Sequence, residues 1–150
     1  MDKIDSFEEV LDFAIENEME AYHFYMDLAQ QMKNPSMCEV FETFAKEELG
    51  HKAKLETIKQ NKKIQPVKNI QDLHIADFVV EVEPGPVMDY QDALVLAMKK
   101  EKAAFRLYIE LANQVENEVQ KSVFLSLAQE EAKHKLRFEI EYDEVVLKEN

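Results

Sequence analysis

Cysteine, glycine and proline are scarce in this sequence, and each scarcity excludes a kind of protein. Cys38 is the only cysteine, so an internal disulfide framework and a cysteine-cluster metal site are both excluded. Two glycines and four prolines among 150 residues leave little material for turns, which favours long helices. A chain of this length is large enough to bury a sizeable core. We therefore expect residues 1–150 to form a single all-α domain.

Basic residues are also in the minority. Lys and Arg number 18 against 31 Asp and Glu, a formal net charge of −13, and this acidity disfavours nucleic acid and anionic membranes as partners. No stretch approaches the roughly twenty apolar residues of a membrane span. The first ten residues lack the basic segment and apolar run of a signal peptide. We expect a cytoplasmic protein.

One apolar helical stripe is interrupted by a carboxylate and an imidazole. Its members follow one another at alternating steps of four and three, the spacing that keeps side chains on one buried face. They are Met37, Phe41, Phe44, Glu48, His51, Leu55 and Ile58. Glu48 and His51 are therefore expected to point into the core. A buried pair of this kind is costly unless a partner offsets the desolvation, and a metal ion is the commonest partner for these residue types.

The chain repeats itself at a shift of 83 residues. Residues 10–56 align with residues 93–139 without a gap, and roughly a third of the positions are identical. The shift places Glu18 on Glu101, Tyr25 on Tyr108, Glu48 on Glu131 and His51 on His134. The protein is therefore expected to be a duplicated helical pair.

The first helical pair is expected over about residues 6–63. Ser6 and Glu9 form a capping box that opens a helix over about 6–32. Asn34 and Pro35 form a cap and first-turn pair, so the second helix begins almost at once and returns antiparallel beside the first.

The second helical pair is expected over about residues 89–147. Asp89 caps its first helix, and a brief polar turn around Asn117 precedes the last helix. The connector, about 64–88, is long enough to traverse the bundle, so the third helix can start at the end opposite to that where the second stops. Within it, residues 70–82 form either a short helix or an extended apolar segment packed across the bundle, and the sequence leaves both open.

The two pairs together present six polar side chains to one core. Two Glu-x-x-His helices and a glutamate from each of two others make the ligand set of a dinuclear metal site in a bundle. The expected ligands are Glu18, Glu48, His51, Glu101, Glu131 and His134. Four carboxylates balance the charge of two divalent ions. Oxygen and imidazole donors favour iron or manganese, so we expect two iron ions, with zinc able to enter during purification.

Tyr25 and Tyr108 lie two turns after Glu18 and Glu101 on the same stripes. A buried phenol needs an acceptor, and a carboxylate on a facing helix is the obvious one, so we expect both tyrosines to orient metal ligands.

Small residues and two further histidines complete the expectations for the site. Ala21 and Ala104 lie one turn after the glutamates of the first and third helices, where they leave space for a ligand the size of dioxygen. His23 falls off the buried stripe and His74 is a lone histidine in the connector, so neither is expected to be a ligand.

At these positions the chain resembles the ferritin-like superfamily and, within it, the rubrerythrin group. The resemblance implies an antiparallel four-helix bundle with a di-iron centre, assembled as a homodimer, whose diferrous form reacts with hydrogen peroxide or dioxygen. The motifs that carry it are Glu18 with Tyr25, Glu48-Leu49-Gly50-His51, Glu101 with Tyr108, and Glu131-Ala132-Lys133-His134.

Two departures from the group, and one comparison with bacterioferritin, bear on function. Rubrerythrins proper carry a rubredoxin domain with two Cys-x-x-Cys pairs, whereas this chain has Cys38 alone, so an external electron donor such as a rubredoxin-like protein is expected. Ala104 replaces an additional glutamate that the group associates with peroxide reduction. The ligand set also resembles that of bacterioferritin, but Leu49 is not the methionine that binds haem there.

The leading hypothesis is a non-haem di-iron oxidoreductase of rubrerythrin type that reduces hydrogen peroxide or dioxygen. The alternative is an iron-binding, ferroxidase or iron-storage protein without peroxidase turnover. A third is a bundle whose metal is structural or absent and whose surface contacts a partner.

Overall fold

The computed structural model describes residues 7–61, 75–80 and 89–149, and this part of the chain is helical with short connections. Its elements are α1 (Phe7–Gln31), α2 (Pro35–Gln60), the 3-10 helix η2 (Ile75–Phe78), α3 (Tyr90–Gln114) and α4 (Glu118–Glu149). The predicted all-α class is confirmed.

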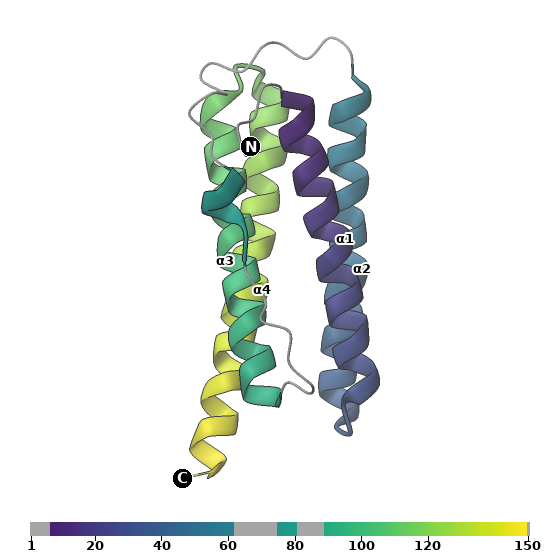
Figure 1. The fold of residues 1–150 in the computed structure, drawn as a ribbon, viewed down its shortest axis with the longest axis vertical. Helices are drawn as coiled ribbons and strands as arrows, with labels where there is room; N and C mark the ends of the chain where they lie inside the picture. Colours follow the sequence, from purple (N-terminus) through teal and green to yellow (C-terminus); the bar gives the residue numbers. More distant parts are fainter. Residues whose placement is uncertain (1–6, 62–74, 81–88, 150) are drawn as a thin grey trace.

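The four long helices form two hairpins that lie side by side. α1 packs mainly on α2, and α3 packs mainly on α4. α3 begins at the end of the bundle opposite to the end where α2 stops, so α1 and α3 run in opposite directions (Figure 1). This is the predicted ferritin-like bundle of two helical hairpins joined by a long crossover.

Side-chain caps fix where the helices begin. The Asn34 carboxamide accepts a hydrogen bond from the Ser36 backbone N–H at 2.8 Å, with Pro35 at the first helical position. Asn117, the equivalent of Asn34 in the repeat, accepts from the Gln120 backbone N–H at 3.0 Å. The α3 cap is the Asp89 carboxylate. The expected cap at Ser6 lies outside the described residues.

Among residues 7–61, 75–80 and 89–149, the buried apolar side chains form two clusters, each built by both hairpins. Their large members are Leu11, Leu55, Leu111 and Phe124 in the first cluster and Tyr25, Phe41, Leu94 and Phe138 in the second. Residues near the start of α1 belong to the first cluster, and their equivalents near the start of α3 belong to the second. Equivalent residues of the two halves therefore lie in opposite clusters. A polar layer separates the two clusters.

In the part of the connector that the structure describes, Phe78 is the residue that packs into the bundle core. Within the expected segment 70–82 the structure describes the turn Ile75–Phe78, so the helical alternative holds for these four residues. Phe78 is buried in the first cluster, and the guanidinium carbon of Arg106 lies 5.9 Å from the centre of its ring. His74 lies outside the described residues.

Glu141 is a buried glutamate outside the polar layer, with 9% exposure near the end of α4. The Tyr90 hydroxyl on α3 donates a hydrogen bond to it at 2.8 Å, and Arg137 lies 3.8 Å away on its own helix. A hydrogen bond from another helix makes this burial tolerable.

Among the described residues, no helix combines the length and the apolar character needed to cross a bilayer.

Candidate metal centre

The polar layer between the two apolar clusters contains all six side chains expected as metal ligands. Each of them is at most 2% exposed. α1 and α3 supply one glutamate each, and α2 and α4 supply a Glu-x-x-His pair each, because residues three apart share a helix face. They are Glu18, Glu48, His51, Glu101, Glu131 and His134.

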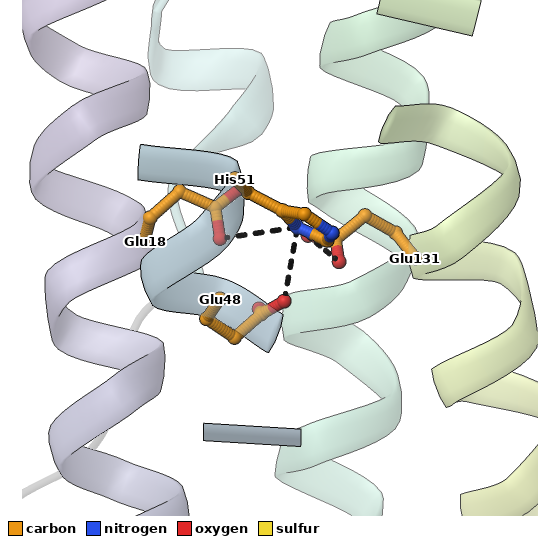
Figure 2. Close-up of side chains that lie close together, drawn as sticks. All are labelled: Glu18, Glu48, His51 and Glu131. Atoms are coloured by element: carbon orange, nitrogen blue, oxygen red, sulfur yellow. Dashed lines mark ion pairs between the residues drawn. The ribbon is translucent and has the colours of Figure 1, made fainter. Parts of the chain in front are cut away.

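Three carboxylates surround the Nδ1 atom of His51 (Figure 2). The Oε1 atoms of Glu48 and Glu131 lie 3.2 and 3.3 Å from it, and that of Glu18 lies 3.6 Å from it. One donor atom from each of these four residues lies within 4.8 Å of the others. The group draws its members from α1, α2 and α4.

A matching group surrounds the Nδ1 atom of His134. The Oε1 atoms of Glu48, Glu101 and Glu131 lie 3.5, 3.6 and 3.6 Å from it. Glu48 and Glu131 therefore belong to both groups, while Glu18 and Glu101 belong to one each. The two groups overlap and are related by the 83-residue repeat.

The converging atoms are polar, buried and without hydrogen bonds. Among the described residues, Oε1 of Glu18, Glu48 and Glu131 and Nδ1 of both histidines have no hydrogen-bond partner. Such atoms are rare in folded proteins because each one loses its hydration without compensation. Carboxylate oxygens and imidazole nitrogens are ligands for first-row transition metals, and five of them directed at one space fit a cation.

Burial and mutual repulsion perturb the carboxyl groups. Desolvation, together with the charges of Glu101 and Glu18, raises the pKa of Glu48 from 4.5 to about 8. The pKa of Glu131 is raised well above its ordinary value, first by burial and then by Glu101, Glu48 and Glu18. Glu48 therefore favours its protonated form at neutral pH when no cation is present, and the pKa of Glu131 is shifted in the same direction.

The histidines shift in the direction that favours their charged form. Burial lowers the pKa of His51, but the nearby carboxylates of Glu18 and Glu48 outweigh it and raise the pKa to about 10. Burial likewise lowers the pKa of His134, and Glu101, Glu48 and Glu47 raise it to about 9. In the metal-free protein, the protonated histidines thus supply the positive charge that the surrounding carboxylates attract.

Two tyrosines hold the glutamates that belong to only one group. The Tyr25 hydroxyl on α1 donates a hydrogen bond to Glu101 on α3, and the Tyr108 hydroxyl on α3 donates one to Glu18 on α1. Burial raises the pKa of both phenols well above 10, and the nearby carboxylates raise it further. Both phenols therefore remain protonated donors, and each hydrogen bond joins the two hairpins.

A cavity of about 300 Å³ reaches this layer between α1 and α3. Ala21 and Ala104 line it, as do the carboxylates of Glu18 and Glu101, and Phe78 of η2 lies at its wall. The small alanine side chains leave room beside the carboxylates for a molecule of a few atoms. His23 is exposed on α1 and does not belong to this buried layer, as expected.

The sequence reasoning missed two glutamates, Glu47 and Glu130. Nε2 of His134 lies 2.6 Å from Oε1 of Glu47, and Nε2 of His51 lies 4.0 Å from Oε1 of Glu130. The signal was present, because Glu47 and Glu130 are equivalent in the repeat and each directly precedes a Glu-x-x-His pair. Phe44, also missed as a contact of the site, stacks on His134 with ring centres 4.0 Å apart.

Fold and layer together define a class: ferritin-like four-helix bundles whose core presents a carboxylate and histidine cluster able to hold metal. The comparison with models of protein families agrees, since residues 9–139 match rubrerythrin. The chain belongs to the rubrerythrin family, whose members typically bind iron.

One solved structure is similar over nearly the whole chain. It is a hypothetical protein from Pyrococcus furiosus with a TM-score of 0.71 and 29% sequence identity, and the match covers 92% of this chain and 89% of that one. Among curated proteins, no significant match was found.

Proposed function

We propose that the protein is a non-haem di-iron oxidoreductase of rubrerythrin type that reduces hydrogen peroxide or dioxygen with electrons from an external donor. The observation that carries the proposal is the overlap of two ligand groups through Glu48 and Glu131. A carboxylate that belongs to two groups can bridge two ions, which a site for a single ion does not require.

The donor set supports iron as the metal. Glu18, Glu48 and Glu131 with His51 would hold one ion, and Glu48, Glu101 and Glu131 with His134 the other. Oxygen and imidazole donors without thiolate suit iron and manganese. The charge of four ionised carboxylates would be balanced by two divalent ions, which offsets the cost of burying them.

Two ferrous ions, when bound, supply the two electrons that convert hydrogen peroxide and two protons into two water molecules. The cavity beside Ala21 and Ala104 provides a route for a small oxidant to the carboxylates. Tyr25 and Tyr108 hold Glu101 and Glu18 in place through their hydrogen bonds. An external donor, a rubredoxin-like protein or a small reductant, would supply the two electrons that each turnover consumes.

Ala104 favours a second candidate function. It stands where the additional glutamate of rubrerythrins proper is expected, and it lines the cavity as a small apolar side chain. A site without that carboxylate suits a ferroxidase or iron-binding protein that reacts with dioxygen and has no peroxidase turnover.

Stopped-flow mixing of the anaerobic, iron-loaded protein with hydrogen peroxide or dioxygen tests both candidates. Rapid oxidation by peroxide, with repeated turnover when a reductant is present, supports the oxidoreductase. Preference for dioxygen and uptake of many irons per chain supports the alternative. Glu131→Ala is the inactive control, because it removes a carboxylate shared by both groups, and Ala104→Glu tests whether an added carboxylate raises the rate with peroxide. Absence of bound iron in the unsubstituted protein after anaerobic loading refutes both candidates.

A further inference from the structure

Each histidine of the layer has a second ring nitrogen, and both of these nitrogens face a glutamate of the opposite hairpin. Nε2 of His134, on α4, lies 2.6 Å from Glu47, on α2. Nε2 of His51, on α2, lies 4.0 Å from Glu130, on α4. Nε2 of His51 has no hydrogen-bond partner among the described residues, so only the contact of His134 is a hydrogen bond. We infer that Glu47 positions His134 crosswise for metal binding, that Glu130 does not do the same for His51, and that Lys133 makes the two positions unequal. The inference rests on the proposed metal site.

A carboxylate on Nε2 determines which nitrogen is free to bind a cation. An ionised carboxylate only accepts hydrogen bonds, so the imidazole nitrogen that faces it carries the proton. The nitrogen that gives up its proton to bind a cation is then Nδ1, which is the atom directed at the carboxylate group in both histidines. The same contact fixes the orientation of the ring and raises its basicity as a ligand. Glu47 thus prepares His134, although it shares its helix with His51.

The two halves of the repeat differ at the residue that competes with the histidine for each glutamate. The Lys133 amino group lies 3.6 Å from Oε2 of Glu130, so Glu130 is drawn toward two partners, Lys133 and His51. The position equivalent to Lys133 is Gly50, which has no side chain to compete for Glu47. This difference accounts for the distances of 2.6 Å on one side and 4.0 Å on the other.

The consequence is that the ion at His134 is bound more tightly than the ion at His51. It also follows that a substitution on α2 acts on the ion whose histidine lies on α4. A glutamate that merely stabilised its own helix would not produce this crosswise effect.

Single-histidine backgrounds test the inference with Co²⁺ as the probe, measured by competition with a chelator and by the visible absorption of the bound ion. In His51→Ala, where only the His134 position remains, Glu47→Ala should weaken Co²⁺ binding about 10- to 100-fold and alter the absorption spectrum. Glu47→Gln, whose carbonyl still accepts a hydrogen bond, should restore much of the affinity. In His134→Ala, Glu47→Ala should change the affinity less than about twofold, a change within the range of unimportant surface substitutions.

Folding is not at risk, because the Glu47 side chain is 41% exposed, and circular dichroism verifies it. Equal losses in both backgrounds, or no loss in either, would overturn the crosswise arrangement while leaving the metal site intact. Failure of the unsubstituted protein to bind Co²⁺ would overturn the metal site and this inference with it.

Substitutions at positions 50 and 133 test whether Lys133 causes the unequal affinity of the two metal positions. Lys133→Ala frees Glu130 and should tighten binding in the His134→Ala background about two- to fivefold at low salt, the range of an exposed ion pair. Gly50→Lys should weaken binding in the His51→Ala background by a similar factor. A side chain fits there, since a Cβ at Gly50 meets no atom within 4 Å, and Gly50→Ala is the control for helix propensity. Both effects should vanish at high salt, and unchanged affinities at low salt would exclude Lys133 as the cause.

Discussion

Metal loading should release protons, and their number follows from the electrostatics of the polar layer. In the metal-free protein the pKa of Glu48 is about 8, that of His134 about 9 and that of His51 about 10, while that of Glu131 is raised well above its ordinary value. Glu48 and both histidines therefore favour their protonated forms at pH 7, and the pKa of Glu131 is shifted in the same direction. Metal binding requires the ligand atoms to lose their protons, so loading two divalent ions should release about three to four protons per chain.

The same count sets the pH dependence of affinity. Each proton that must leave weakens apparent binding tenfold for every pH unit below the pKa of its group. The overall constant for two ions should therefore fall by about three to four powers of ten for each pH unit below 7.

The assay is a titration of Mn²⁺ into weakly buffered protein containing an indicator dye, with metal content measured on the same sample. Glu141→Gln is a suitable control, because it removes the charge of a buried glutamate outside the layer and should leave the count unchanged. Stoichiometric loading that releases less than about one proton would refute the reasoning, since it would show that the layer is already deprotonated before the ions arrive.

Three further predictions follow from the same geometry. Glu48→Ala and Glu131→Ala should each abolish dinuclear loading, measured by metal analysis, while the unfolding free energy of the metal-free bundle rises or holds, because a buried carboxyl is removed; global unfolding of either variant would contradict this. His51→Ala and His134→Ala should each lower metal content from about two ions per chain toward one, with unequal effects on reactivity, and full occupancy in either would show that its histidine is not a ligand. Since Glu48, His51 and His134 hold protons in the folded state that the unfolded chain gives up at lower pH, their contribution to metal-free stability should be complete below pH 4.5. It should decline as pH rises toward about 8 for Glu48 and toward about 9 to 10 for the histidines. Thermal midpoints at pH 6 and pH 9 measure this decline, and a higher midpoint at pH 9 would contradict it.

The sequence was sufficient for the bundle because its signals are local and repeated. Apolar spacing of three and four places Glu48 and His51 on the buried face of α2, and the 83-residue shift identifies Glu131 and His134 as their equivalents. Once each helix has a single buried face, antiparallel packing leaves little freedom in where the polar residues meet.

The contacts that the sequence did not reveal depend on how closely separate helices approach one another. Glu47 lies beside the buried stripe and is partly exposed, so its pattern is that of a solvated helix face. Only the approach of α4 turns it into a partner of His134. Within the second hairpin, the Tyr90 hydroxyl on α3 likewise donates a hydrogen bond to the buried Glu141 on α4. The connector has no period from which a structure could be predicted, and only its residues 75–80 are described.

The hydrogen bonds that cross between the two hairpins suggest how this chain evolved. Tyr25 serves Glu101, Tyr108 serves Glu18, and Glu47 serves His134, so each half supplies the supports for ligands of the other half. Such reciprocity is what two identical hairpins would show if they first met as separate subunits and were later fused. After the fusion, a ligand and its support lie in different copies of the ancestral segment. A substitution that weakens a support in one copy therefore acts on a ligand in the other copy, so we expect the two halves to diverge together.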